Sequence, residues 1–388
     1  MWVKYLPFLA GGGGGSDPPP DDDPPPPPQA SSIGRKSPVN KRAASGKNRG
    51  RRVPPGIVLK VSPQPGRHPF HVPLLPVNEA NLARAAEVLR AGGTVAFPTE
   101  TVYGLGALAF DSAAVARIFE IKRRPSFDPL IVHVAGRAML DEVVAGVPPA
   151  ALALIEAFWP GPLTLVLRKS AAIGDLVTAG ASTVAVRMPS HPVARALLEA
   201  IGAPLAAPSA NPFGALSPTH ARHVAAHLGA RVDLILDGGP AEHGIESTIV
   251  ALEPRPLLLR PGAIPVEEIE AIAGPLDREA EGAPIVPGRL PQHYSPATRL
   301  RVIDPALVAP AQRQGAASLA LSHTFGGYDV SRALSSEGDL RVAAARFFET
   351  LHELDAMGVV RIDAQPFPES GLGLAIMDRL RRAAARNS

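Results

Sequence analysis

Residues 78–100 read NEANLARAAEVLRAGGTVAFPTE, and this stretch decides the fold. Apolar residues recur at helical spacing from Leu82 to Leu89, and the Gly-Gly pair that follows them ends the predicted helix. Residues 94–100 then form a short apolar run that is typical of a buried strand. Helical and strand-like segments keep alternating, which predicts an α/β domain with a mixed sheet over residues 79–274.

A second, smaller α/β domain is predicted at the C-terminus. Residues 275–298 are rich in Pro and Gly, which indicates a linker. Residues 299–388 then hold strand-like segments, a long helical segment at 340–358 and a closing helical segment at 371–385.

Residues 1–78 are rich in Pro, Gly and basic residues and are predicted to be disordered, because so little apolar surface cannot offset the entropy lost on ordering. The whole chain has 39 Lys and Arg, 36 Asp and Glu and a net charge of +3. Residues 1–78 hold eleven of these bases and only four of the acids, so the predicted folded part is negative overall. Composition leaves open whether residues 1–72 are a real tail or an over-extended gene start.

Targeting and redox signals are weak or missing. The apolar stretch at the N-terminus is interrupted by Pro7, and no later segment offers the roughly 20 uninterrupted apolar residues of a membrane span. We therefore expect a soluble, cytoplasmic protein. The chain has no cysteine, which excludes a disulfide scaffold, a thiolate zinc site and a cysteine nucleophile.

The segment PTETVYGLG, residues 98–106, is the first candidate for a binding site. It follows a predicted strand, and ligands of open α/β sheets gather beyond strand ends. Three hydroxyl groups, those of Thr99, Thr101 and Tyr103, crowd this short stretch. The Gly-x-Gly by itself favours an ordinary turn, and its spacing does not match a phosphate loop.

Cations follow at strand and helix ends. Lys122, Arg123 and Arg124 end a predicted helix, where they either complement the helix dipole or form an anion site. His133 lies in a predicted strand, as a buried core histidine or as a substrate contact. Arg187 ends another strand, so it needs a carboxylate partner from the protein or from a substrate.

Other polar residues stand at turns, where each has an ordinary turn explanation, or in the linker, where a His-Tyr pair amid prolines is less usual. They are Ser209, Asn211, Ser217, Ser247, Arg260, His293 and Tyr294. The His-Tyr pair of the linker either covers a pocket as a lid or packs between the domains. The sequence has no nucleophile elbow, P-loop or zinc-type His-Glu-x-x-His. A hydroxyl- and cation-lined cleft of this kind suits reactions whose substrates supply nucleophile and leaving group, as in nucleotidyl transfer.

Seven motifs in this order closely resemble the long, two-domain form of the threonylcarbamoyl-AMP synthases: FPTETVYGLG, KRRPSFDPLIVH, FWPGPLTLVL, STVAVRMP, APSANPFGALSPT, GIESTIV and LLLRPGAI. The resemblance covers nearly everything from about residue 79 to 388. It implies a YrdC-like open twisted mixed sheet with a concave basic cavity, joined to a smaller Rossmann-like α/β domain. It also implies that L-threonine, bicarbonate or carbon dioxide, and ATP condense to threonylcarbamoyl-AMP and pyrophosphate. A partner transferase complex of the family then modifies adenosine beside the tRNA anticodon.

The resemblance also assigns roles to particular residues. Lys122 and Arg124 match its Lys-x-Arg pair and are the expected catalytic residues, which hold the ATP phosphates. The expected L-threonine contacts are Thr99, His133, Arg187, Ser209 and Ser247. The expected ATP contacts are Lys122, Arg124, Thr183, Asn211, Ser217, Arg260 and Tyr294. Magnesium is expected with the ATP, because its phosphate charges exceed what these cations offset.

Two positions depart from the family pattern. Arg123 stands where a small residue is usual, and Asp128 where Asn usually precedes Pro-Leu. Two rival functions also follow from the sequence. A carbamoyl-adenylate-forming enzyme of the hydrogenase-maturation type shares the YrdC-like domain, but such proteins carry zinc-binding cysteines that this chain lacks. A non-catalytic RNA-binding module would use the basic cleft and tail, and direct tRNA binding rests on these features alone.

Overall fold

The computed structural model describes residues 72–280, 282–289 and 293–385, which belong to one compact unit. Most of the predicted tail, residues 1–71, lies outside the described residues. Its last residues do not: Leu74–Pro76 form strand β1, which pairs in parallel with strand β8 (Leu234–Asp237). The predicted disorder is therefore wrong for this end of the tail, because backbone pairing with an edge strand orders it. No helix of the described residues is long and apolar enough to span a membrane.

The larger of two sheets has ten strands in the order β1-β8-β2-β3-β7-β4-β6-β5-β9-β10. Pairs of both directions occur, such as β4 with β6 in parallel and β5 with β6 antiparallel, so the predicted mixed sheet is confirmed. The remaining strands are β2 (Val95–Phe97), β3 (Gly104–Leu108), β4 (Ile131–His133), β5 (Leu163–Arg168), β6 (Thr183–Arg187), β7 (Leu205–Ala206), β9 (Thr248–Ala251) and β10 (Leu257–Arg260).

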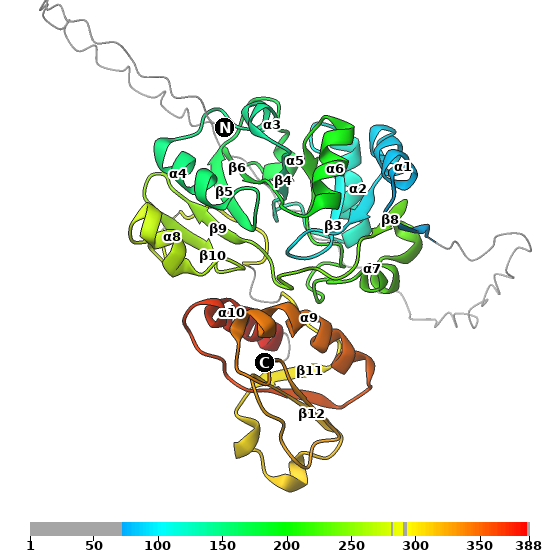
Figure 1. Ribbon diagram of the computed structural model, residues 1–388, viewed down its shortest axis with the longest axis vertical. Helices are drawn as coiled ribbons and strands as arrows, with labels where there is room; N and C mark the ends of the chain where they lie inside the picture. The colour runs from blue at the N-terminus through cyan, green and yellow to red at the C-terminus, as the bar shows by residue number, and fades with distance from the viewer. Residues whose placement is uncertain (1–71, 281, 290–292, 386–388) are drawn as a thin grey trace, which may run out of the picture. The chain divides into compact units, whose positions relative to one another are not determined.

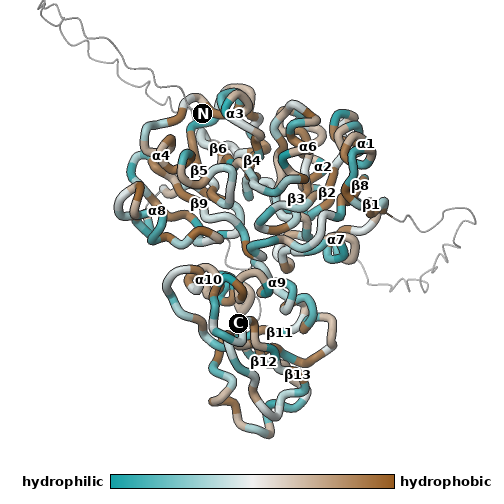
Figure 2. The backbone as a smooth tube through the Cα atoms, in the orientation of Figure 1, coloured by the Kyte–Doolittle hydropathy of each residue, from teal (hydrophilic) through white to brown (hydrophobic). Residues whose placement is uncertain are grey.

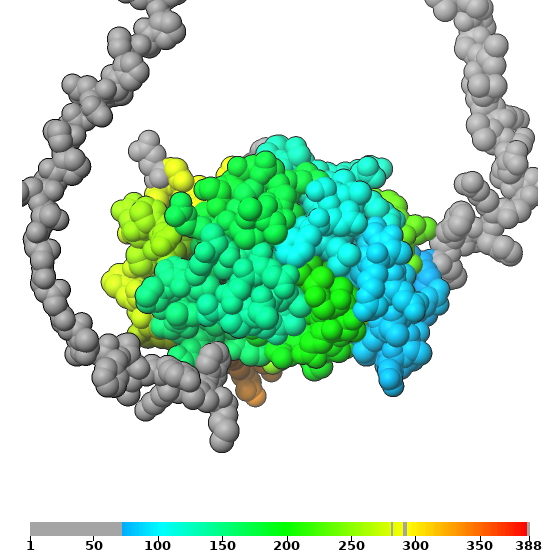
Figure 3. All heavy atoms as spheres, turned by 90° about the horizontal axis from the view of Figure 1, so that it is seen from above, coloured from blue at the N-terminus to red at the C-terminus, as the bar shows by residue number. Residues whose placement is uncertain are grey.

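Helices cover both faces of this sheet (Figure 1). One face packs on α1 and α6, and the other packs mainly on α2, α4, α7 and α8. In Figure 3, the first described residues, in blue, lie beside cyan and green residues that follow them in the chain. The helices are α1 (Glu79–Arg90), α2 (Ser112–Lys122), α3 (Arg137–Val143), α4 (Pro149–Phe158), α5 (Asp175–Thr178), α6 (Pro192–Ile201), α7 (Ala221–His227), the short 3-10 turn Gly229–Arg231, and α8 (Val266–Ala273).

Strand β2 shows how the sequence produces this layering. Successive side chains of a strand point to opposite faces, and all three residues of β2 are buried. Val95 and Phe97 pack on the α1 and α6 side, whereas Ala96 packs on the opposite side. A strand buried on both faces has to be apolar throughout, and Figure 2 allows this hydropathy to be followed along the chain.

The smaller sheet follows, with four parallel strands in the order β11-β14-β12-β13. Helices α9 (Leu340–Ala356) and α10 (Leu372–Ala384) pack on it and share one apolar cluster with its strands. Its strands are β11 (Arg299–Val302), β12 (Ala316–Ala320), β13 (Val330–Ala333) and β14 (Arg361–Ala364), with 3-10 turns at Pro305–Leu307 and Pro310–Gln312.

The glycines of the first motif have a role that the sequence did not indicate. Gly104 and Gly106 lie inside β3, antiparallel to β2, instead of forming a turn. A Cβ at Gly106 would stand 2.7 Å from Cε1 of the Phe97 ring. Glycine is therefore needed here for the close approach of a ring to the backbone.

Arg123 ends α2 in the left-handed conformation, with φ of 53°, and its side chain is exposed. Non-glycine residues pay about 1 kcal/mol for this conformation, and glycine avoids that cost. We expect Arg123→Gly to leave the free energy of unfolding unchanged or to raise it by up to about 1 kcal/mol. Urea denaturation checks this, with Arg123→Ala as the control that keeps the strained conformation. A loss above 1 kcal/mol in the glycine variant would contradict it.

Candidate active site

A cavity open to solvent lies between the large sheet and the segment that follows β10. Its wall combines the loop after β2, the ends of β4, β6 and β10, and the residues Pro287, Gly288, His293 and Tyr294. Eight of the predicted site residues line it, namely Thr99, Arg124, His133, Arg187, Ser209, Ser247, Arg260 and Tyr294. Segments far apart in the sequence thus converge on one site.

The loop after β2 is held by its own hydroxyl groups. The Thr99 hydroxyl donates to the Val102 carbonyl at 2.5 Å and lies 2.9 Å from the Thr101 hydroxyl. The Tyr103 hydroxyl donates to the Gly239 carbonyl at 2.6 Å, which ties the loop to the segment after β8. The hydroxyl density noted in the sequence therefore serves in part to shape this loop.

Arg187 has a carboxylate partner within the protein. Its Nη2 lies 2.5 Å from Oε1 of Glu100, and its Nη1 donates to the Thr101 hydroxyl at 2.8 Å. Burial opposes the charge of Glu100, but the Arg187 guanidinium outweighs burial, and the pKa of this carboxyl is lowered. The carboxylate partner therefore comes from the protein itself, and Arg187 also lines the cavity.

His133 is buried, but its hydrogen bonding is incomplete. Burial, with the positive charge of Arg187 beside it, lowers the pKa of His133 to about 3, so the ring is neutral at physiological pH. Its Nδ1 has no hydrogen-bond partner in the described part of the chain. A buried polar atom without a partner is costly, so a ligand in the cavity would satisfy it.

Asp128 forms a buried ion pair with Arg124, in which Nη2 of Arg124 lies 2.9 Å from Oδ2 of Asp128. Arg124 also donates from Nε to the Asp128 carbonyl at 2.9 Å and from Nη2 to the Pro129 carbonyl at 2.6 Å. Burial raises the pKa of Asp128 and so opposes its charge. The acidic residue at this position therefore restrains Arg124, a cation of the cavity wall.

Lys122 lies behind the cavity wall instead of lining it. Its Nζ donates to the backbone carbonyls of Ser209 and Asn211, and its side chain is almost fully buried. Burial, with repulsion from Arg124, lowers the pKa of Lys122 well below its ordinary value. Lys122 thus fixes the turn that presents Ser209 to the cavity.

Three other predicted ATP contacts do not line this cavity. The side-chain amide of Asn211 donates to the Ala215 carbonyl at 2.8 Å, and its Oδ1 has no partner among the described residues. The Ser217 hydroxyl donates to Oε1 of Glu246. Thr183 begins β6, at the opposite end of the strand from Arg187.

Arg260 joins the sheet to the segment after α8. Its Nη2 donates to the Ser247 carbonyl at 2.8 Å and to the Ser247 hydroxyl at 3.1 Å, and its Nη1 donates to the Pro287 carbonyl at 3.0 Å. Tyr294 lies beside it, and burial, with the nearby Glu246 carboxylate, raises the pKa of its hydroxyl to about 12. Gly288 makes room for this hydroxyl, since a Cβ there would stand 2.2 Å from it.

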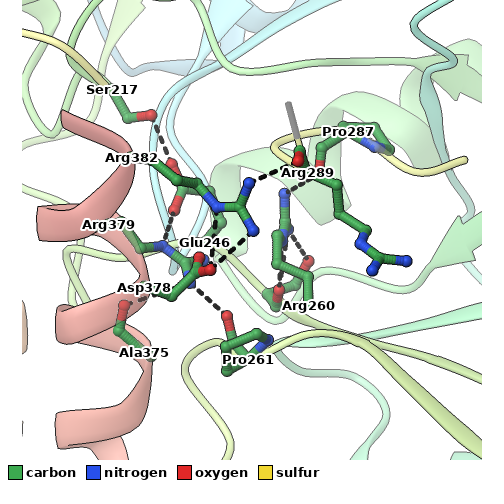
Figure 4. Close-up of polar contacts among 11 residues, drawn as sticks. Ser217, Glu246, Arg260, Pro261, Pro287, Arg289, Ala375, Asp378, Arg379 and Arg382 are labelled. Atoms are coloured by element: carbon green, nitrogen blue, oxygen red, sulfur yellow. Dashed lines mark hydrogen bonds and ion pairs between the residues drawn. The ribbon is translucent and has the colours of Figure 1, made fainter. Parts of the chain in front are cut away.

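Sequence reasoning missed several residues that shape the site. Glu246 lines the cavity, and Glu100 pairs with Arg187. Arg379 is fully buried and lies 3.0 Å from Glu246 (Figure 4). One signal for Arg379 was present: it falls three and four positions after Ile376 and Ala375, on the apolar face of the closing helix.

The carboxylates near the cavity are already engaged by arginines, Glu100 by Arg187, Asp128 by Arg124 and Glu246 by Arg379. Within the described ranges, no group of three or more His, Asp or Glu side chains is arranged to hold a metal ion. The residues described therefore do not fit a magnesium ion held by the protein.

Two family models match this chain. The Sua5–YciO–YrdC model, described as telomere recombination, matches residues 87–262, and the model of the threonylcarbamoyl-AMP synthase C-terminal domain matches residues 264–385. The threonylcarbamoyl-AMP synthase of Bacillus subtilis (strain 168) is 42% identical over 327 residues, which cover 80% of this chain and 94% of the relative. That of Pyrococcus abyssi (strain GE5 / Orsay) is 40% identical over 326 residues, which cover 79% and 95%.

A solved structure agrees in fold. The crystal structure of P. abyssi Sua5 complexed with L-threonine aligns with a TM-score of 0.75 at 39% sequence identity, covering 80% of this chain and 97% of that chain. Identity at this level over almost the whole length of the relatives confirms the resemblance seen in the motifs. The chain therefore belongs to the threonylcarbamoyl-AMP synthases, a family of nucleotidyltransferase enzymes that serve tRNA modification.

Proposed function

We propose that this protein condenses L-threonine, bicarbonate or carbon dioxide, and ATP into L-threonylcarbamoyladenylate and pyrophosphate. The observation that carries the proposal is the cavity wall, where three buried arginines stand among hydroxyl groups and a neutral histidine. Such a wall binds a carboxylate and a polyphosphate side by side. Support also comes from the relative that was solved with L-threonine.

The chemistry proceeds through the substrates' own groups. The threonine amine adds to carbon dioxide and loses a proton, which gives a carbamate. A carbamate oxygen then forms a bond to the α-phosphorus of ATP, the bond from that phosphorus to the bridging oxygen breaks, and pyrophosphate leaves. With a pKa near 3, His133 is a poor base, so we assign it a hydrogen bond to threonine.

The protein contributes position and charge. We assign threonine to Thr99, His133, Arg187, Ser209 and Ser247, and the nucleotide to the side of the cavity near Arg124, Arg260 and Tyr294. Fixed cations stabilise the charge that develops on the α-phosphoryl group, because they need not reorganise during the reaction. Magnesium would enter as the ATP complex, held by the phosphates, since the nearby carboxylates already pair with arginines.

The product would pass to a transferase complex that modifies tRNA beside the anticodon, and we place this reaction in the cytoplasm. Threonylcarbamoyl-AMP is a mixed anhydride, so its carbamoyl group is activated for transfer to an amine. The proposal requires no tRNA contact by this chain itself.

The test is pyrophosphate release by the full chain with ATP, magnesium, bicarbonate and L-threonine, together with the mass of the product. We expect release to depend on threonine and to fall sharply with L-serine or without an amino acid. ATP consumption that ignores threonine would contradict the proposal. So would salt-dependent tRNA binding without any ATP consumption, which would favour the RNA-binding alternative.

A further inference from the structure

Helix α10 carries an arginine on its buried face, where the other residues are apolar or glycine. Arg379 is fully buried, and it is the largest fully buried side chain in the described part of the protein. Arginine is almost never buried without partners that take its hydrogen bonds and charge. An aliphatic residue of similar volume would pack α10 at least as well, so the reason for an arginine must lie in what it contacts.

Arg379 contacts three separate segments next to the cavity, and Figure 4 shows its contacts with Glu246 and Pro261. Its Nε lies 3.0 Å from Oε2 of Glu246, just before β9. Its Nη1 donates to the carbonyl of Pro261, just after β10. Its guanidinium carbon stands 5.4 Å from the centre of the Tyr294 ring, which is a cation–π contact.

Each of these contacts joins Arg379 to a residue that lines the cavity or that follows a lining residue. Glu246 and Tyr294 line the cavity, and Pro261 follows Arg260, whose guanidinium also lines it. The second oxygen of Glu246 accepts the hydroxyl of Ser217, so the carboxylate is held from both sides. Arg379 itself is not among the lining residues. Any effect on a ligand must therefore act through its neighbours.

The same helix also contacts the backbone at Arg289, which lies before Tyr294 in the chain. Asp378 lies 3.2 Å from Nη1 of Arg379 and 2.8 Å from Nη2 of Arg382. Arg382 donates from Nη1 to the backbone carbonyl of Arg289 at 2.5 Å (Figure 4). Helix α10 thus contacts both the backbone of Arg289 and the ring of Tyr294.

The segment that carries Glu246 lies directly on helix α9. A Cβ at Gly244 would stand 2.3 Å from the carbonyl oxygen of Ala345 and 2.6 Å from that of Ala344. No side chain fits between these backbones, so this contact fixes Glu246 relative to the C-terminal sheet and its helices.

We propose that Arg379 is a positioning residue of the active site, which orders the nucleotide side of the cavity by fixing Tyr294, the Arg260–Pro261 turn and Glu246. The C-terminal part of the chain is then a component of the active site. The proposal rests on the function proposed above, for which the nucleotide is ATP. Neutralising Glu246 alone would need only a positive charge, whereas contact with all three segments needs the guanidinium fork.

The test compares four full-length variants with the wild type. Arg379→Lys keeps the charge beside Glu246 and loses the fork. Glu246→Gln together with Arg379→Met removes both charges and so avoids a buried, unpaired carboxylate, and Glu246→Gln alone is its reference. Arg381→Ala is the matched control on the same helix, because Arg381 pairs with Glu369 at the exposed surface. Melting temperature establishes folding, and KM for ATP and for threonine are measured separately.

We expect Arg379→Lys to raise KM for ATP at least tenfold and to change KM for threonine less than threefold. The double variant should show the same rise relative to Glu246→Gln, and Arg381→Ala should stay within twofold of wild type. Wild-type KM for ATP in folded Arg379→Lys, or no difference between the double variant and Glu246→Gln, would overturn the proposal. Either result would show that Arg379 only balances the charge of Glu246.

Calorimetric binding of a non-hydrolysable ATP analogue separates this inference from the proposed function. If the wild type binds the analogue but releases no pyrophosphate with threonine, the proposed reaction fails. The ratio of analogue dissociation constants between Arg379→Lys and wild type then still tests Arg379, with at least a tenfold loss expected and an unchanged constant contradicting it.

Discussion

Lys122→Met is expected to reduce threonine-dependent pyrophosphate release by about 10²- to 10³-fold, the usual cost of removing a group that stabilises developing charge. The side chain acts in two ways. Its Nζ holds the carbonyls of Ser209 and Asn211, and it lies behind the cavity wall that we propose faces the ATP phosphates. Losing the buried donor also leaves these carbonyls unsatisfied, at about 1–3 kcal/mol. We therefore expect a lower melting temperature with a transition that stays cooperative.

The measurement is pyrophosphate release at saturating threonine, beside a thermal melt of each variant. Lys169→Met is the matched control, because Lys169 forms a surface ion pair with Asp175 away from the cavity. It should stay within twofold of wild-type activity. A folded Lys122→Met protein with near-normal release would remove Lys122 from the catalytic machinery.

Arg187→Met is expected to destabilise the protein by about 3–5 kcal/mol at pH 7, because it leaves Glu100 buried and unpaired. Adding Glu100→Gln removes that carboxylate, so the double variant should recover most of the lost stability. Threonine should still bind poorly to the double variant, with KM raised about 10²-fold, because the guanidinium that we propose binds the substrate carboxylate is gone. Denaturant titration and threonine-dependent kinetics measure the two effects separately.

The stability that Arg187→Met loses relative to wild type should become smaller as the pH falls. In the wild type, the ion pair lowers the folded-state pKa of Glu100, so its stabilisation is present above the unfolded pKa and is lost as pH falls. Without Arg187, burial alone raises that pKa. The cost of the charged carboxylate then disappears as the pH falls and Glu100 takes up a proton. The stability gap to wild type should narrow from pH 7 to pH 5, and a gap that widens would contradict this assignment.

Periodicity and motif order predicted most elements, and eight of the predicted site residues meet at the cavity. The helix beginning at Glu79 and the buried strand β2 followed from residues 78–100, because apolar spacing reports burial directly. Strand β1 was missed, since three residues next to a Pro-rich segment become a strand only when β8 is there to pair with them. Such pairing is a long-range property that local composition does not contain.

The sequence also could not predict which residues pair with the buried charges. The strand position of Arg187 required a carboxylate, but nothing in the order of residues chose Glu100 over a substrate. Lys122 was expected at the phosphates, and its burial behind Ser209 depends on how a turn 87 residues later folds back onto α2. A motif indicates which residue types come together, whereas packing sets how far each of them lies from the cavity.

The close contact at Gly244 limits how this protein can be divided or recombined. No side chain fits between Gly244 and the backbone of α9, and Glu246 pairs with Arg379 of α10. The segment before β9 and the two C-terminal helices are therefore matched to each other. A shortened chain that ends after β10 would keep the Glu246 carboxylate and lose its ion-pair partner Arg379. A chimera with another chain would therefore have to exchange residues 244, 246 and 379 together.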